Sequence, residues 1–557
     1  MSKTRSNVPP HGRADRQGVS SDLALKLSVR PGRRSAPQVV KTWIVPMLVV
    51  IVVAFLVSTA FYAVDLFYFD GLLLGAPGLL EHYLEFRPSL ITDALPALGV
   101  TVVATLGIIL TVIAIIVQLS AERYTGVAMM FLRDPVHVLV LSFYIVASLC
   151  AVWLSVTLRA DFVPRSLLLF VMSLTSIGLA TMLPYFAYTF WFLEPGNILE
   201  RLRARASRLS QRGFAAESAA EVAAAQVEFL RQVEEITDIA NNSVEGRDRI
   251  IAVNAVDALR DFLITYAAER PDGPNPWYRI GEPLNFTPGF VGTERQLLAE
   301  VEARALWVEW TILREYLGIY REAMGSMPEV NGAIAINTRY VGEIAAQSGR
   351  EDLVRMVMRF LNVYLQLAIH DGHPAVACDV SRQYRMLLEE LLQLGNDSAA
   401  CEGVSFLQDY GHIAFDAELP AVTETVAFDV ARLCEHAHAN GLTGENRILR
   451  QLLDLDEGDT VRSKRQERTL RGVRCAQTKL ALYYLAAGEV AKARLIAEDM
   501  QDMENKELAD LRADMTQTPP PHFWEALDQG RTLHYLTEAE RSQFDAFFTL
   551  QRSATGA

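Results

Sequence analysis

The chain has 557 residues, of which 51% are hydrophobic, and a formal net charge of −14. This length is enough for two or three domains. The acidic balance excludes a nucleic-acid-binding role, which needs a basic footprint. Its five scattered cysteines show no CxxC spacing and fit free thiols in a reducing compartment.

The N-terminal segment is basic. Residues 1–42 carry nine Lys or Arg against Asp15 and Asp22, so this arm has a charge of +7 and the remainder of the chain −21. We expect a disordered cytoplasmic arm over residues 1–42. The first apolar run begins only near Trp43, exceeds the apolar part of a signal peptide in length and has no A-x-A-like site after it. It therefore does not read as a secretory signal.

Four segments are long and apolar enough to cross a bilayer. Aromatic residues mark their ends, most densely between Tyr185 and Phe192, and Pro184 is expected to kink the fourth helix. The sequence predicts a four-helix transmembrane domain over residues 43–195. Its helices are expected at about 43–69, 98–119, 136–158 and 164–193.

The charges that flank the spans predict their direction. The basic arm precedes the first span and five arginines follow the fourth, whereas the loop over 70–97 has four acids against Arg87 alone. Both chain ends are therefore predicted on the cytoplasmic side of the membrane. The loop fits either a plain connector or a short helix on the membrane surface. The helix would use Leu79, Leu80, Tyr83, Leu84 and Phe86.

From residue 196 onward, apolar residues recur at steps of three and four, as in amphipathic helices. We predict a helical connector over 196–270, a Pro/Gly-rich loop over 271–293 and a helical cytoplasmic domain over 294–557. Small and aromatic residues over 475–500 have the spacing of a tetratricopeptide-like hairpin. The domain is thus a set of helical hairpins or a solenoid, whose face would bind a protein partner.

Signatures of catalysis and of cofactor binding are missing from the sequence. Cys434 and His438 share a helix face, but His436 points elsewhere, so three metal ligands do not converge. His370 and His373 are more typical of a turn between helices than of a metal site. We therefore expect no enzymatic activity, no cofactor and no bound metal.

Polar residues in and after the second span are the first candidates for function. Thr111 and Gln118 are seven residues apart and share a helix face, where they would line an aqueous path or, more commonly, bond to another helix. Beyond them the chain turns polar abruptly. Candidate pore, gate or domain-coupling residues are Thr111, Gln118, Ser120, Glu122, Arg123, Arg133 and Asp134.

A basic run stands out in the acidic helical domain. Its side chains would contact anionic headgroups or an acidic partner, although a solvated helix face paired with Glu467 is the commoner explanation. The run consists of Arg462, Lys464, Arg465, Arg468, Arg471 and Arg474.

After the second predicted span comes a polar turn at Gln118, followed by a Phe-Leu-Arg-Asp motif at Phe131 to Asp134 directly before the next span. The segment reads IIVQLSAERYTGVAMMFLRDP. This pattern resembles the bacterial predicted-membrane-protein family called domain of unknown function 2254. The match covers about 43–265. It departs from the family in two places. Arg123-Tyr124-Thr125 replaces a Ser-Pro-Arg element, and the Asp-Pro pair that begins the second helix of the family's helix–turn–helix, matched here by Asp238–Phe262, is replaced near Asp248. The resemblance to this family, as a divergent member, implies four spans and a cytoplasmic helical region, and no enzymology. It also implies that the membrane is the inner membrane of a bacterial cell.

These expectations describe an all-α polytopic membrane protein with two candidate functions. An oligomeric passive pore or gated conduit, regulated by the helical domain, is the leading hypothesis because four nearly uncharged spans are fused to that domain. The alternative is a non-conducting membrane scaffold or sensor that recruits a protein partner through the helical domain. The expected partners are the lipid bilayer, further copies of the chain and a protein, and no nucleic acid.

Overall fold

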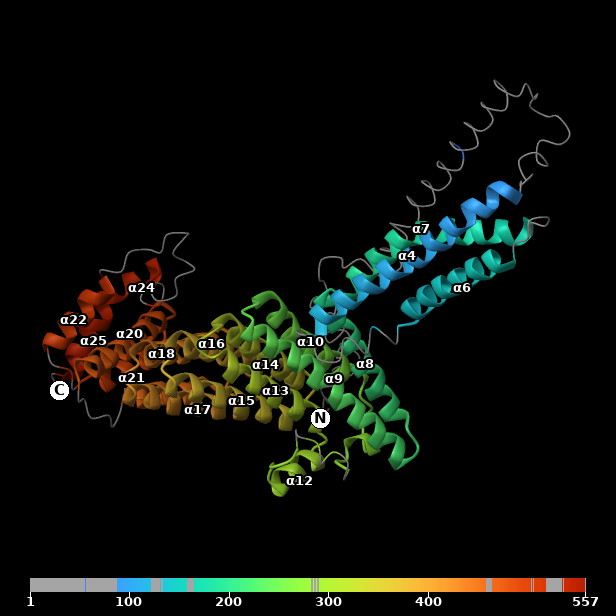
Figure 1. Ribbon diagram of the computed structural model, residues 1–557. Coiled ribbons are helices and arrows are strands. Elements are labelled where there is room, and N and C mark those ends of the chain that lie inside the picture. The colour runs from blue at the N-terminus through green and yellow to red at the C-terminus, as the bar shows by residue number, and fades with distance from the viewer. Residues whose placement is uncertain are drawn as a thin grey trace, which may run out of the picture. The chain divides into compact units, whose positions relative to one another are not determined.

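The computed structural model shows an all-helical chain: every regular element of the described residues is a helix (Figure 1). This confirms the all-α prediction. The chain divides into two compact units, whose described parts lie within residues 27–202 and within residues 203–557. The described residues are 56, 88–121, 131, 134–157, 165–281, 284, 287, 290–456, 463–501, 503, 505–516, 533 and 535–555.

The first unit contains three packed helices, α4 (Pro88–Ala121), α6 (Pro135–Thr157) and α7 (Arg165–Leu193). Each holds a segment long and apolar enough to cross a membrane, namely Gly99–Gln118, Pro135–Leu154 and Leu168–Leu193. The last three predicted spans are therefore confirmed as long apolar helices. The first predicted span, 43–69, lies outside the described residues except for Leu56, and so does the loop segment 79–86.

Most of the surface of these helices is apolar and uncovered, since only 22%, 22% and 28% of the three segments is buried within the described structure. Many of their Ser and Thr hydroxyls donate to a carbonyl of the same helix; Thr111, for example, donates to the carbonyl of Gly107 at 2.8 Å. Where α6 meets α7, Tyr144 donates to the carbonyl of Gly178 at 2.6 Å. Such helices suit a solvent that offers no hydrogen bonds.

The second unit is a stack of helical hairpins. After α8 (Pro195–Ala215) the chain forms α9 (Ala219–Glu245) and α10 (Arg249–Glu269). The stack continues with α12 (Arg295–Ala303), α13 (Trp307–Ala323), α14 (Pro328–Gln347), α15 (Glu351–His370), α16 (Pro374–Gln393), α17 (Asp397–Asp416), α18 (Pro420–Ala439) and α19 (Glu445–Leu453). It ends with α20 (Lys464–Ala486), α21 (Val490–Asp499), α22 (Asn505–Thr516), α24 (Glu538–Ser542) and α25 (Phe544–Thr555).

A strict period governs the middle of this stack: α14 to α18 are 20 residues long, and each begins 23 residues after the previous one. Every turn between them ends a helix in the same way. The amide of His373 donates to the carbonyl of Ala368 at 2.8 Å, and that of Asn396 to Leu391 at 2.9 Å, as in a Schellman motif. The left-handed residue of each turn recurs at the same period, at Gly349, Gly372, Gly395, Glu418 and Gly441.

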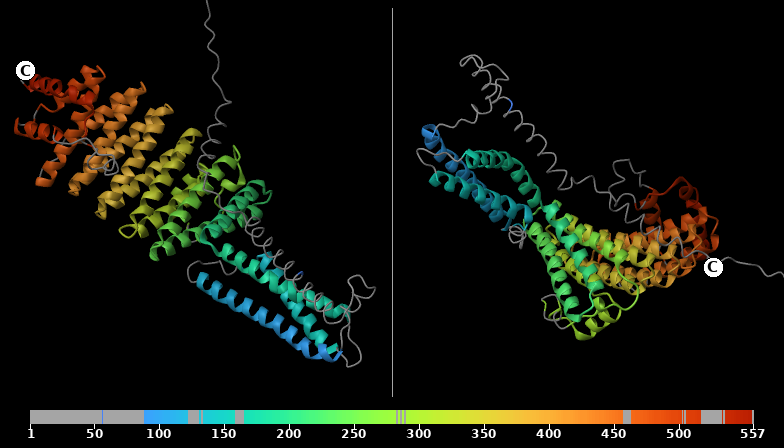
Figure 2. Two further views of the ribbon diagram at one scale, coloured as in Figure 1. Left: turned by 90° about the horizontal axis from the view of Figure 1, so that it is seen from above. Right: turned by 90° about the vertical axis from the view of Figure 1, so that its right-hand side faces the viewer.

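Alternate helices form two layers. In one, α10, α14, α16, α18 and α20 each pack on the next, and in the other α13, α15, α17 and α19 do so. Figure 2 shows the hairpins following one another along this unit. The hairpin expected over 475–500 is formed by α20 and α21, with Ala481, Tyr484 and Ala493 fully buried. That single hairpin is one part of a longer array.

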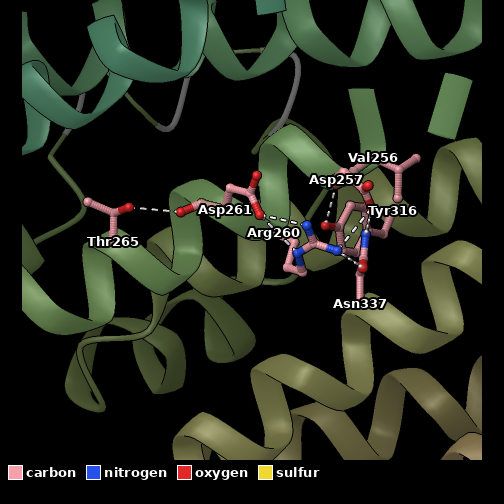
Figure 3. Close-up of polar contacts among 7 residues, drawn as sticks. All are labelled: Val256, Asp257, Arg260, Asp261, Thr265, Tyr316 and Asn337. Carbon is pink, nitrogen blue, oxygen red and sulfur yellow. Dashed lines mark hydrogen bonds and ion pairs between the residues drawn. The ribbon is translucent and has the colours of Figure 1, made fainter. Parts of the chain in front are cut away.

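Arginines link the helices of the first layer. In Figure 3, Arg260 of α10 bonds to Asp257 (3.1 Å), to Asp261 (2.7 Å) and to Asn337 of α14 (3.0 Å). The next two helix pairs of this layer are linked in the same way. From α14 to α16, Arg339 donates through Nε to Gln383 at 2.8 Å, and from α16 to α18, Arg385 donates through Nε to Asp429 at 2.9 Å.

The last two links repeat after 46 residues, which is two helices, because Arg339 and Arg385 occupy the same place in successive hairpins. Each also pairs with a glutamate one turn later on its own helix, Glu343 or Glu389. We call Arg260, Arg339 and Arg385, with their acceptors, the arginine ladder. Burial raises the pKa of Asp429, and the Arg385 guanidinium opposes that shift.

The predicted loop over 271–293 is irregular, as expected, but it is anchored in the core. Trp277, in a single 3₁₀ turn (Pro276–Tyr278), is fully buried and lies 5.1 Å from the ring of Trp307. Gln226 holds the carbonyl of Trp277 at 2.9 Å. On the other side the ring rests on Gly213 of α8, where a Cβ atom would be only 2.0 Å from it.

Replacing Glu418 by glycine should stabilise the turn between α17 and α18 by about 0.5–1 kcal/mol, because glycine adopts its φ of 55° without a steric cost. Hydrogen–deuterium exchange of α17 and α18 in the full-length protein should slow accordingly. The matched control is Gly395→Ala, where φ is 74° and no atom lies within 4 Å of the new Cβ. It should speed exchange at its own turn, and faster exchange in Glu418→Gly would contradict the expectation.

Gly213→Ala should lower the stability of the helical unit by about 1–3 kcal/mol, since the new methyl group overlaps the Trp277 ring. The measurement is the midpoint of thermal unfolding followed by circular dichroism. Gly318→Ala is the control, because Gly318 lies inside α13 with no atom within 4 Å of an added Cβ. That change should raise the midpoint. A wild-type midpoint for Gly213→Ala would show that Trp277 does not depend on this contact.

Candidate functional site

A cluster of aromatic and polar side chains lies where α6 begins and α7 ends. Asp134 stands directly before α6, and its carboxylate accepts the amide of Val136 at 2.9 Å, so it caps that helix ahead of Pro135. The whole cluster belongs to the first unit. We call it the α6–α7 cluster; its members are Phe131, Asp134, His137, Tyr185, Tyr188, Phe192 and Arg201.

His137 is the centre of the cluster and is only 1% exposed. Its Nδ1 atom is 3.0 Å from the hydroxyl of Tyr185. Its ring stacks on Phe131 with centroids 3.5 Å apart and meets the ring of Phe192 edge-on at 5.2 Å. Nε2 has no hydrogen-bond partner among the described residues. An imidazole is thus kept in an aromatic enclosure with one of its two polar atoms unsatisfied.

Asp134 connects this enclosure to α7. Tyr188 donates its hydroxyl to the two oxygens of Asp134, at 3.1 and 3.2 Å. Beyond the end of α7, the guanidinium of Arg201 lies over the ring of Phe192, 3.7 Å from its centroid. Burial lowers the pKa of Arg201. The ordinary pKa of an arginine is so high that the guanidinium is effectively always protonated.

This geometry fixes the position of α6 against α7. Two hydroxyl contacts tie the first turn of α6 to the last turns of α7, so a displacement of either helix along the other would break both. Among the described residues, no group of three or more His, Cys, Asp or Glu is placed to hold a metal ion.

The structure brings one of the seven membrane-domain candidates, Asp134, into the α6–α7 cluster. Thr111 and Gln118 are exposed on α4, and Thr111 bonds within its own helix instead of to another. Ser120 belongs to the last turn of α4. Glu122, Arg123 and Arg133 lie outside the described residues.

Sequence reasoning missed His137, Tyr185, Tyr188 and Arg201. His137 carries a usable signal, because a histidine at the start of a membrane span is rare and usually functional. The two tyrosines look like ordinary interfacial aromatics in the sequence. Their contacts to residues about 50 positions earlier appear only in the fold.

The basic run is divided by the fold. Lys464, Arg465 and Arg468 are exposed on α20. Arg471 instead faces α22, with its guanidinium 3.5 Å from Asp510 and 3.6 Å from Asp514. Arg474 is half-buried on the same helix, and Arg462 lies outside the described residues. A contact surface formed by this run is thus limited to its first three described members.

No family model matches the chain, and no curated protein or solved structure is similar enough to it to count as a match. The resemblance to the domain of unknown function 2254 family stays a prediction.

The pair formed by His137 and Tyr185 yields a double-mutant test. His137→Phe or Tyr185→Phe alone should cost about 1–3 kcal/mol, because each strands the polar atom of its partner in an apolar enclosure. The double variant should recover most of that loss, since both polar groups are then gone. Thermal unfolding of the protein in lipid nanodiscs measures this coupling. Strictly additive losses would show that the two side chains do not interact.

Proposed function

We propose that the protein is a membrane-anchored scaffold whose helical stack binds a protein partner. The observation that carries this proposal is the regular array from α13 to α21, with two layers of helices and a fixed 23-residue period in its middle. In such an array each repeat contacts only the repeats next to it, so long continuous faces stay open. Other repeat proteins use such faces to bind their partners.

The exposed end of the basic run supplies the most specific feature of that surface. Lys464, Arg465 and Arg468 are exposed within the first turns of α20, in a chain that is otherwise strongly acidic. A partner with an acidic segment would be attracted there, and the attraction would weaken with salt. We propose this surface as the first contact of the partner.

The membrane topology belongs to the same proposal. Three helices suited to crossing a bilayer support membrane anchoring. We propose a fourth span over 43–69 and both chain ends in the cytoplasm of a bacterial cell, on the charge pattern of the flanking segments. Self-association in the membrane is also proposed, because so much apolar helix surface is uncovered in the described part of the chain.

A conducting pore is supported less well. The hydroxyl of Thr111 bonds to its own helix at 2.8 Å, so it needs no water-filled path to be satisfied. Purified protein in planar bilayers, tested under voltage, tension and changed pH, should therefore show no conductance. A reproducible unitary conductance would contradict the scaffold proposal and favour a pore.

The scaffold is tested by co-purification of the full-length protein from native membranes after mild crosslinking. We expect a stoichiometric protein partner whose recovery falls at least tenfold when Lys464, Arg465 and Arg468 are all changed to Gln. The control changes Arg212, Arg321 and Arg494, three exposed arginines elsewhere in the helical unit, to Gln and so removes the same charge. An equal loss of partner recovery in both variants would mean that the partner is held by non-specific charge attraction. Recovery of no partner from any sample would contradict the scaffold proposal.

A further inference from the structure

A cavity of about 320 Å³ is lined by α13 and α15 and, in part, by α12. Its walls are apolar side chains from one face of each helix. Trp310 and Leu317 come from α13, and Met356 and Phe360 come from α15. Val301 of α12 and Leu306 complete the apolar lining.

The rim of the cavity carries four arginines and two acids. Both acids are occupied by one arginine: Arg304 lies 2.6 Å from Glu300 and 2.8 Å from Asp352. A second, Arg314, lies over the ring of Trp310, 5.0 Å from its centroid, and within 3.3 Å of Glu315. Each acid of the rim therefore already has a guanidinium partner.

The other two arginines are unmatched. Arg355 and Arg359 are exposed one turn apart on α15, beside the mouth of the cavity. Neither makes a hydrogen bond or an ion pair in the part of the chain that the structure describes. Two guanidinium groups at this spacing present planar donors suited to one carboxylate or phosphate.

We propose that this cavity binds a single-chain anionic amphiphile, a long-chain carboxylate, with its alkyl chain between α13 and α15 and its head group on Arg355 and Arg359. An apolar interior with a few convergent polar groups is the usual form of a small-molecule site. The volume lies at the low end of such sites, which suits one alkyl chain and not the two of a bilayer phospholipid. The inference does not depend on the scaffold function.

The first test titrates dodecanoate into the full-length protein in phosphatidylcholine nanodiscs by calorimetry. We expect saturable binding with one site per chain. Arg355→Gln with Arg359→Gln should weaken it about ten- to hundredfold, because two charge-assisted hydrogen bonds are lost. Dodecanol should bind wild type as weakly as dodecanoate binds this variant. The charge-matched control, Arg212→Gln with Arg494→Gln at two exposed arginines of α8 and α21, should bind like wild type.

The second test locates the chain. 11-Bromoundecanoate should quench the fluorescence of Trp310, and the quenched component should disappear in Trp310→Phe. Val363→Trp, which adds bulk to the cavity wall, should abolish dodecanoate binding while the circular dichroism melting curve stays that of wild type. A Trp310 signal that does not change on binding would overturn the assignment.

Three further outcomes also overturn it. They are equal binding of dodecanol and dodecanoate, undiminished binding by the Arg355/Arg359 variant, and no binding by wild type. Displacement of dodecanoate when the nanodiscs are made of phosphatidylglycerol would assign the cavity to a bilayer lipid and reject the single-chain ligand.

Discussion

The helical unit depends on the contacts that keep successive hairpins in register. Apolar burial is non-directional, whereas a hydrogen bond requires one particular donor and acceptor to meet at a fixed distance and angle. The arginine ladder is directional: Arg385 donates to Asp429 at 2.9 Å, and Ser381 donates to the same carboxylate at 2.7 Å. A slip by one residue would leave these charges buried without partners. Such a loss costs far more than a surface ion pair contributes.

The same reasoning applies to the membrane unit at smaller scale. The α6–α7 cluster uses two hydroxyl contacts and a stacked imidazole where apolar side chains of similar shape would pack equally well. Polar groups that stability does not require are commonly kept for another purpose, such as a switch or a defined register. The cluster lies where α6 begins and α7 ends, at the ends of two helices that are apolar enough to cross a membrane.

The sequence was informative where the physical signal is local. The apolar spans over 98–119, 136–158 and 164–193 follow from length and composition alone, and so does the helical character of the rest. The array was harder to see because its period resides in turns. Glycine marks most of these turns, but Glu418 replaces it in one. The helices themselves all show the same three- and four-residue apolar pattern, so they do not reveal where one repeat ends and the next begins. The partners of His137 are about 50 residues away, so no local pattern announces them.

The 46-residue recurrence of the arginine ladder also restricts how this protein can evolve in length. Insertion or loss of one 23-residue helix would move every later helix into the opposite layer and place its arginines out of reach of their acceptors. Insertion or loss of two helices would preserve the alternation and the hydrogen-bond partners. The length of the array should therefore change between relatives in whole hairpins, by duplication or deletion of paired helices.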